Sequence, residues 1–205
     1  PGEASKVLAV RLDLQGSLSA PERAAHLAQI RERWPLHEGA VFRQSDWEAA
    51  KRASLQVLLT GQYPAASIAS SQAIVDPRTR QVTLEITVDS GPAFTFGTLE
   101  VSGLQRYQRS VVERLNPIEP GSAYSQASLL EFQSRLQGSR YFAEALVSAD
   151  IDPARPQRAP VRVRVVEAPS KKFGLGAGVS TNTGLRGQLE YQDRNFMDRA
   201  WRLSS

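Results

Sequence analysis

An internal repeat is the feature that most limits how this chain of 205 residues can fold. The segment PLHEGAVFRQSDW, residues 35–47, aligns without a gap with PIEPGSAYSQASL, residues 117–129. In both copies a Pro/Gly turn precedes a helix start, and the matched pairs are Pro35 with Pro117, Gly39 with Gly121, Phe42 with Tyr124 and Gln44 with Gln126. A period of about 80 residues indicates that one small supersecondary unit occurs twice.

Hydrophobic periodicity predicts the same five elements in each copy, in the order strand, helix, helix, strand, strand. Gly61 and Gly138 come where the second helix of each copy should end, and we interpret both as C-terminal caps. The predicted strands cover residues 7–14, 66–75 and 82–88 in the first copy, and 94–101, 143–151 and 161–167 in the second.

Three serines mark predicted helix starts. Ser19 with Glu22 and Ser45 with Glu48 have capping-box spacing, in which the serine oxygen and the glutamate satisfy backbone N–H groups that the helix leaves free. Ser125 is suited to cap the matching helix of the second copy, although no glutamate follows at that spacing.

The last strand of each copy alternates most strictly between apolar and polar residues, which is typical of a strand with one face in a core. We therefore predict an α+β fold with two tandem β-α-α-β-β domains, residues 1–91 and 92–170, and place Trp34 and Trp47 in the first core. The alternating apolar residues are Val82, Leu84, Ile86 and Val88, then Val161, Val163 and Val165.

Alternation returns near the end of the chain, over residues 173–180 and 185–192, around a short polar turn. Two such strands suit either a soluble hairpin or a membrane β-barrel, whose strands need about 9–11 residues with one face toward lipid. Periodicity alone does not separate the two. The density of glycine in the first strand favours the barrel, because glycine permits the bending that closure requires.

Composition argues against several functions. Net charge is +4 without a dense basic stripe, so we expect no nucleic-acid partner. The absence of cysteine excludes disulfides and thiolate metal sites. His26 and His37, the only histidines, have no partner at catalytic or metal-binding spacing, and no nucleophile, phosphate-loop or metalloprotease motif occurs. We therefore predict no enzyme activity, catalytic residue, cofactor or metal site.

The repeated unit resembles the POTRA domain of the BamA superfamily of outer-membrane proteins. The resemblance is carried by Pro-x-x-x-Gly in both copies, ending at Gly39 and Gly121, by the Gly-x-Tyr that begins at Gly61, and by LEVSG at residues 99–103. The C-terminal stretch resembles the opening of the superfamily's barrel, and the matching residues are Ser180, Thr181, Gly184, Asp193, Arg194 and Asn195. Within the superfamily the TamA family is the most similar.

The resemblance implies that residues 1–170 lie in the periplasm of a Gram-negative cell and that residues 171–205 begin a transmembrane antiparallel barrel. Because the chain opens at Pro1 and stops within a third alternating stretch, we expect a truncated part of a longer protein. The implied function is to assist insertion, assembly or translocation of β-rich outer-membrane and autotransporter proteins. The implied partners are unfolded outer-membrane clients, an inner-membrane-anchored subunit and outer-membrane lipid.

Alternatives remain at this point: a two-partner secretion transporter, a BamA-type insertase, or a soluble peptide-binding adaptor. In all of them the expected working surface is a sheet edge, to which an extended peptide adds through main-chain hydrogen bonds. The candidate edges are the strands of residues 82–88 and 161–167 or the weaker strands beside them, and the sequence leaves this choice open.

Overall fold

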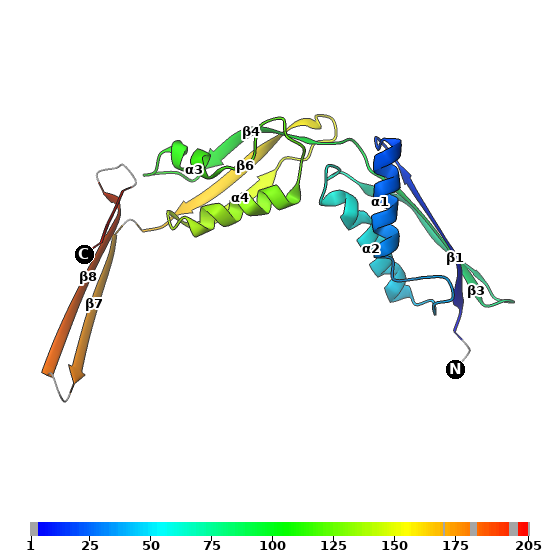
Figure 1. The fold of residues 1–205 in the computed structure, drawn as a ribbon, viewed down its shortest axis with the longest axis horizontal. Helices are drawn as coiled ribbons and strands as arrows, with labels where there is room; N and C mark the ends of the chain where they lie inside the picture. The colour runs from blue at the N-terminus through cyan, green and yellow to red at the C-terminus, as the bar shows by residue number, and fades with distance from the viewer. Residues whose placement is uncertain (1–3, 170, 181–183, 197–200, 205) are drawn as a thin grey trace. The chain divides into compact units, whose positions relative to one another are not determined.

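The computed structural model describes residues 4–169, 171–180, 184–196 and 201–204. Its strands form three sheets of three strands each, one from each repeat and one from the C-terminal stretch. Both repeats show the predicted order of strand, helix, helix, strand, strand (Figure 1). The domain boundaries at residues 91 and 170 stay a prediction.

The first domain contains β1 (Lys6–Gln15), α1 (Ala20–Glu32), α2 (Gln44–Leu59), β2 (Ser67–Asp76) and β3 (Gln81–Asp89). The strand order is β1-β3-β2, with β1 parallel and β2 antiparallel to β3. Both helices lie on one face of this sheet (Figure 1). The parallel β1–β3 pair needs a crossover connection, and the two helices supply it.

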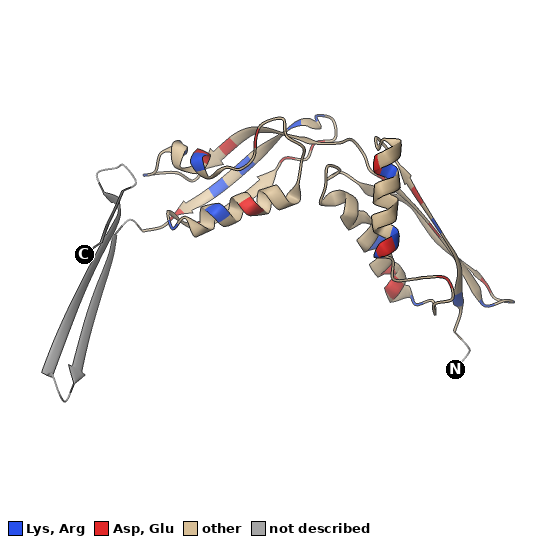
Figure 2. Ribbon diagram, viewed as in Figure 1, with Lys and Arg blue, Asp and Glu red and all other residues tan. Residues whose placement is uncertain are grey.

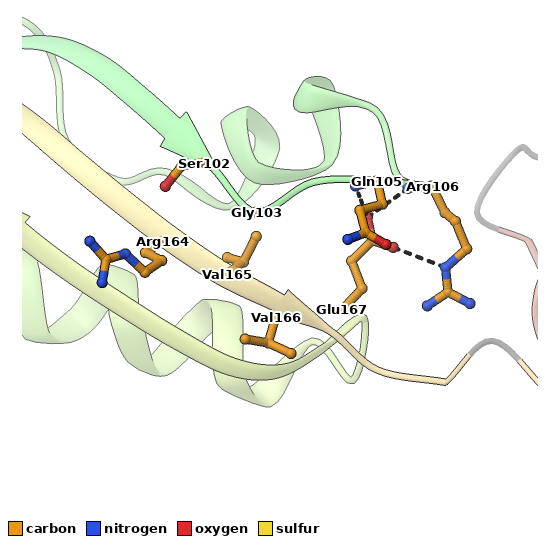
Figure 3. Close-up of a pocket in the computed structure, with 8 residues that line it drawn as sticks. All are labelled: Ser102, Gly103, Gln105, Arg106, Arg164, Val165, Val166 and Glu167. Atoms are coloured by element: carbon orange, nitrogen blue, oxygen red, sulfur yellow. Dashed lines mark hydrogen bonds and ion pairs between the residues drawn. The ribbon is translucent and has the colours of Figure 1, made fainter.

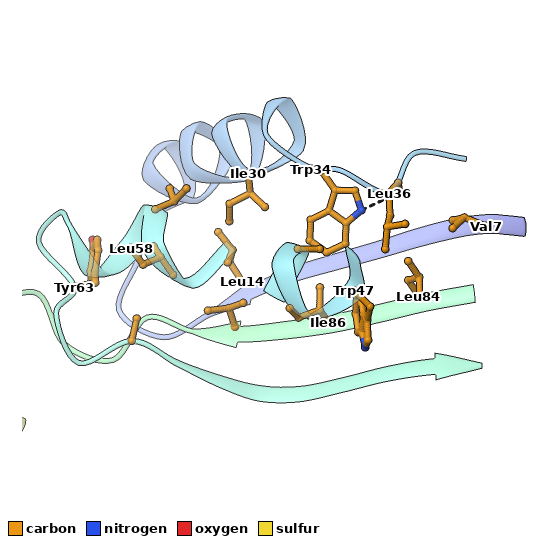
Figure 4. Packing of buried hydrophobic residues seen from close by; sticks show 14 of the residues in the cluster. Val7, Leu14, Ile30, Trp34, Leu36, Trp47, Leu58, Tyr63, Leu84 and Ile86 are labelled. Carbon is orange, nitrogen blue, oxygen red and sulfur yellow. Dashed lines mark hydrogen bonds between the residues drawn. The ribbon is translucent and has the colours of Figure 1, made fainter. Parts of the chain in front are cut away.

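The first core fills the layer between these helices and the sheet (Figure 4). Leu14, Ile30 and Leu58 are each at most 2% exposed, so strand and helix side chains meet without water between them. Trp34 and Trp47 pack edge to face with ring centres 6.1 Å apart, and the Trp34 indole N–H donates to the Leu36 carbonyl at 3.0 Å. The prediction that both tryptophans belong to the core is confirmed.

The helix starts agree only in part with the predicted caps. Before α1, the Ser19 N–H donates to the Glu22 carboxylate at 2.9 Å, as a capping box requires. The prediction for α2 is wrong: Ser45 lies inside the helix, and Glu48 instead pairs with Lys51 at 2.7 Å. Helix α4 (Gln126–Gly138) does have its serine cap, because Ser125 Oγ accepts the Ser128 N–H at 3.4 Å.

The second domain repeats the layout with β4 (Thr95–Ser102), α3 (Arg109–Leu115), α4, β5 (Phe142–Ala149) and β6 (Gln157–Glu167), in the strand order β4-β6-β5. Gly97 lies beside Arg158 and Gly103 beside Val165, so β4 and β6 run in the same direction. The core contains Phe96, Phe132 and Leu136, each at most 1% exposed.

The Pro/Gly turns have the same structural role in both domains. Gly39 and Gly121 have φ values of +83° and +86°, which glycine adopts without steric cost. Their N–H groups donate to the carbonyls of Val7 at 2.8 Å and Phe96 at 2.7 Å. Each turn therefore folds back and pairs with the start of its domain's first strand. The predicted glycine caps are displaced: α2 ends at Leu59 with Thr60 as its C-cap, one residue before Gly61, and Gly138 is the last residue of α4. Neither glycine has the positive φ of a left-handed cap.

The C-terminal sheet contains β7 (Lys171–Ser180), β8 (Gly184–Phe196) and β9 (Trp201–Ser204). β7 and β8 are antiparallel, with Ser180 opposite Gly184 at the turn and Lys171 opposite Asp193 at the far end. The predicted hairpin is thus present. Arg194 and Asn195 continue β8, while Thr181 lies outside the described residues. Among the described residues, no helix has both the length and the apolar composition needed to cross a membrane.

Candidate strand-docking edges

The strands with the strictest alternation are not sheet edges. β3 and β6 are the central strands of their sheets, so neighbouring strands occupy both of their hydrogen-bonding sides. The prediction that residues 82–88 and 161–167 form the docking edges is therefore wrong. Strict alternation marks a strand whose inner face is fully buried, and a central strand meets that condition best. The buried residues are Val82, Leu84, Ile86, Val88, Val161, Val163 and Val165, none more than 2% exposed.

The weaker strands beside them are the sheet edges: β1 and β2 in the first domain, β4 and β5 in the second. The Pro/Gly turns already pair with the start of β1 and of β4, through bridges between Lys6 and Val41 and between Thr95 and Ala123. β2 and β5 have no such turn along their outer sides among the pairings of the described residues.

β2 is the edge that carries the least protection against pairing with another chain. No residue from Ser67 to Val75 is charged, and the side chains of Ile74 and Val75 are 51% and 47% exposed. Natural edges usually carry charges, proline or strong bulges that block further strands. The one irregularity in β2 is a register shift between Ile68 and Ser70, near the beginning of the strand.

Each of the other edges contains charged residues within the strand. In β1, Arg11 forms an ion pair with Glu85 at 2.8 Å, and Asp13 follows two residues later. In β4, Glu100 lies 3.3 Å from Arg162, and β5 carries an exposed Glu144. A peptide that adds to these strands would have to pass or desolvate such groups, whereas one that adds to β2 between Ser67 and Val75 would meet only uncharged side chains.

The chain leaves the second domain through a set of contacts around Glu167, at the end of β6. Its carboxylate accepts the N–H groups of Gln105, Arg106 and Tyr107 at 2.8, 2.9 and 3.0 Å. The Arg106 guanidinium donates to the same carboxylate at 2.9 Å (Figure 3). We call Glu167, Arg106 and the backbone of residues 105–107 the exit clamp.

The electrostatics of the exit clamp favour an ionised Glu167. Its side chain is only 5% exposed, and this burial acts to raise the pKa. The three backbone N–H groups and Arg106 outweigh burial and lower the pKa of Glu167 from 4.5 to about 2. The carboxylate therefore stays charged, and the clamp stays closed, over the physiological pH range.

The next residue, Ala168, is held from two sides. Its carbonyl accepts a hydrogen bond from Arg106 at 2.8 Å, and its N–H donates to the Tyr141 carbonyl at 2.8 Å. A hollow of about 560 Å³ lies beside the clamp, lined by Ser102, Gly103, Gln105, Arg106, Arg164, Val165, Val166 and Glu167 (Figure 3). These two bonds fix the backbone at Ala168, the first residue of the linker to β7.

The backbone corner at the exit clamp has a counterpart in the first domain, and a short sequence match that the repeat alignment missed marks both corners. Residues 12–16, LDLQG, match LEVSG at residues 99–103, and both glycines come directly after the first strand of a domain. Gly16 and Gly103 have φ values of +98° and +90°, and both pack against the last strand of their own sheet. Aligning the two glycines would have found this corner from the sequence.

The histidines lie away from these features. His26 in α1 contacts the Tyr63 ring edge to face, with centres 5.9 Å apart. Among the described residues, no group of three or more His, Cys, Asp or Glu side chains is placed to hold a metal ion. The absence of enzyme activity stays a prediction.

Three solved structures show what the fold resembles. BamA from Haemophilus ducreyi lacking POTRA domains 1–3 matches with a TM-score of 0.71 at 15% identity, over 95% of this chain and 36% of that one. POTRA3–5 of Haemophilus influenzae BamA matches with a TM-score of 0.59 at 20% identity, over 80% and 61%. POTRA1–2 of Omp85 from Anabaena matches with a TM-score of 0.54 at 13% identity, over 82% and 98%.

No family model matches the chain. At these identities the solved structures establish the fold, and the two α+β domains have the POTRA architecture that the resemblance implied. The chain spans about a third of the first BamA structure and about three fifths of the second.

Proposed function

We propose that this chain is the periplasmic arm of an outer-membrane β-barrel protein, with two POTRA domains in the periplasm and a barrel that begins at β7. The support is the order of the elements: two POTRA-type domains are followed by an antiparallel pair of 10 and 13 residues. Strands of about 9–11 residues are long enough to cross the hydrocarbon layer when tilted. The match to a BamA chain extends over 95% of the residues.

The arm assists insertion, assembly or translocation of β-rich outer-membrane proteins, autotransporters among them, and the motif pattern places the protein nearest the TamA family. Its clients are unfolded outer-membrane proteins, and an inner-membrane-anchored subunit is a further partner. The contact is β-augmentation, in which an extended client segment becomes an additional strand at the outer side of β2.

The open edge of β2, uncharged from Ser67 to Val75, is the observation that carries this proposal. Backbone N–H and C=O groups supply the hydrogen bonds, so clients of unrelated sequence can bind. Ala69, Ser70 and Ser71 are small, and they leave room for varied client side chains beside the strand. The exposed Ile74 and Val75 add apolar contact near the end of β2.

Site-specific crosslinking in cells tests the proposal. A photoreactive amino acid replaces Gln72 on the edge strand β2 or, as a matched control, Gln81 on the central strand β3; both glutamines are exposed. We expect adducts with outer-membrane clients from position 72 and few from position 81. Equal adducts from both positions, or none from position 72, would refute the assignment to β2.

Introducing a positive charge at the edge gives a functional test at the same pair of positions. Gln72→Lys places a cation on the uncharged edge, while Gln81→Lys makes the same chemical change on a strand paired on both sides. We expect only Gln72→Lys to weaken binding of an extended peptide taken from an outer-membrane protein, because lysine is a common natural block to edge pairing. Unchanged binding by Gln72→Lys would contradict β-augmentation at this strand.

A further inference from the structure

The central strand of the second sheet carries a row of arginines on its helix-free face. Successive strand residues point to opposite faces, and Val161, Val163 and Val165 are buried toward the helices. Arg158, Arg162 and Arg164 therefore share the other face, where all three are exposed, and Figure 2 shows the basic bands along β6. The same face of β3 in the first domain carries Gln81, Thr83, Glu85, Thr87 and Asp89.

Two of the three arginines have no ion pair with any residue in the described part of the chain. Arg162 pairs with Glu100 at 3.3 Å. Arg158 and Arg164 form no hydrogen bond or ion pair through their guanidinium groups among the described residues. Arg164 borders the hollow beside the exit clamp, and Val166, 51% exposed, is the next residue on this face. The end of β6 thus combines a free cation with exposed apolar surface.

The end of β6 is also tied by a short linker to the segment that we place at the membrane. Only residues 168–170 separate Glu167 from Lys171, so those two residues lie at most about 14 Å apart. Arg164 precedes Glu167 by about 10 Å of strand, and Arg158 lies about 20 Å farther back. Because the exit clamp holds residues 105–107 to Glu167, β6 does not unravel to lengthen this linker.

We propose that the helix-free face at the end of β6, with Arg164 and Val166 as its main contacts, binds the phosphate headgroups of an anionic membrane surface. The inference rests on the proposed function, which places β7 at the membrane. A membrane surface fits better than an acidic peptide, because the cation lies beside the exposed side chain of Val166 and only a short linker separates this end of β6 from β7. Guanidinium groups bind phosphate, and a neighbouring apolar side chain enters the interfacial layer.

Vesicle flotation of the whole chain tests this inference, with phosphatidylcholine vesicles compared with mixed phosphatidylcholine and phosphatidylglycerol vesicles. We expect the wild-type chain to bind the mixed vesicles more strongly, and Arg164→Gln to reduce this excess by about fivefold. Arg158→Gln removes the same charge from the same face, farther from β7, and should reduce the excess by about twofold at most. Both arginines are exposed, so both variants should fold.

Two outcomes overturn the inference: equal effects of the two substitutions, or no excess binding to the anionic vesicles. Binding of a polyglutamate peptide that Arg164→Gln abolishes, without any preference for anionic vesicles, would instead assign the face to an acidic protein partner. Binding to phosphatidylcholine alone reports on the C-terminal strands. Its loss would count against the proposed barrel, and the phosphatidylglycerol-dependent excess reports separately on the arginine face.

Discussion

The two domains hold the same corner with different chemical groups. In the first domain, hydroxyl groups bond the backbone after β1 to the end of β3. In the second domain, a carboxylate and a guanidinium bond the backbone after β4 to the end of β6. Ser90, fully buried, accepts the Ser17 N–H at 3.1 Å, and the Ser17 hydroxyl donates to the Gly91 carbonyl at 2.7 Å. The exit clamp of Glu167 and Arg106 occupies the corresponding corner. The same backbone geometry is thus stabilised mainly by hydroxyl groups in the first domain, where the Asp89 carboxylate also accepts the Gly91 N–H at 2.9 Å, and by an ion pair in the second.

The difference predicts different responses to pH. Hydrogen bonds between hydroxyl and backbone groups do not change between pH 2 and 7 because none of those groups titrates there. The exit clamp depends on an ionised Glu167, whose folded pKa of about 2 lies below its ordinary 4.5. We therefore expect acid to weaken the corner of the second domain, which precedes β7, more than the hydroxyl corner of the first domain.

The largest expected loss of stability follows substitution of the glycine that each corner contains, Gly16 in the first domain and Gly103 in the second. In Gly103→Ala, the new Cβ would lie 2.0 Å from the Val165 carbonyl oxygen at a φ of +90°, so a central strand must move. We expect the second domain to lose about 3 kcal/mol or more of stability. In Gly16→Ala the closest atom is the Ser90 hydroxyl at 2.3 Å, which rotates more easily, and about 1–2 kcal/mol should be lost.

Hydrogen exchange in the whole chain measures both effects, read at β6 amides for Gly103→Ala and at β3 amides for Gly16→Ala. Each variant serves as the control for the other, since only the substituted domain should lose protection. A larger loss in Gly16→Ala than in Gly103→Ala would show that the two corners do not differ as the contacts suggest.

Glu167→Gln should have the next largest effect. A folded pKa of about 2 against 4.5 corresponds to about 3 kcal/mol of stabilisation at neutral pH. Because the folded pKa is depressed, this stabilisation is complete above pH 4.5 and disappears as pH falls toward 2. The stabilities of wild type and Glu167→Gln should therefore differ most near pH 7 and converge near pH 2, as measured by exchange of the Arg106 and Tyr107 amides.

Glu100→Gln is a matched control for the loss of one carboxylate from the second domain. Glu100 pairs with Arg162, but its side chain is 53% exposed, so the pair should contribute about 0.5 kcal/mol or less. A pH-independent difference between wild type and Glu167→Gln, or a Glu100→Gln effect of similar size, would contradict the ionic role of the exit clamp.

Much of the fold was predictable because the two central strands alternate over their length and the order of elements is repeated. The core faces of β3 and β6 follow from alternation, and the order of elements follows from the repeat. The edges were not predictable in the same way, since alternation reports burial and says nothing of which strand lacks a neighbour. The candidate site therefore moved from Val82 and Val161 to β2, whose alternation is weak because none of its residues is fully buried.

The errors at single residues also have local causes. Ser45 with Glu48 fits the capping-box spacing, yet α2 begins at Gln44 after Arg43, and the serine lies in the first turn of the helix. The exit clamp joins residues about 60 positions apart, and sequence spacing carries no sign of that contact. Only a match of Gly16 with Gly103 would have pointed to it, because a glycine at the same point of two repeats indicates a shared backbone requirement.

Ser90→Ala tests the hydroxyl corner of the first domain and should have a smaller effect than Gly103→Ala or Glu167→Gln. The substitution removes the acceptor of the Ser17 N–H, but that N–H keeps a weaker contact with the Gly91 carbonyl at 3.4 Å. We expect a loss of about 1–2 kcal/mol in the first domain. The loss should be the same at pH 3 and pH 7, measured by exchange of β3 amides, because no titrating group takes part in the removed bond. A loss that shrinks at low pH, as predicted for Glu167→Gln, would contradict the expectation that the bond removed with Ser90 is independent of pH.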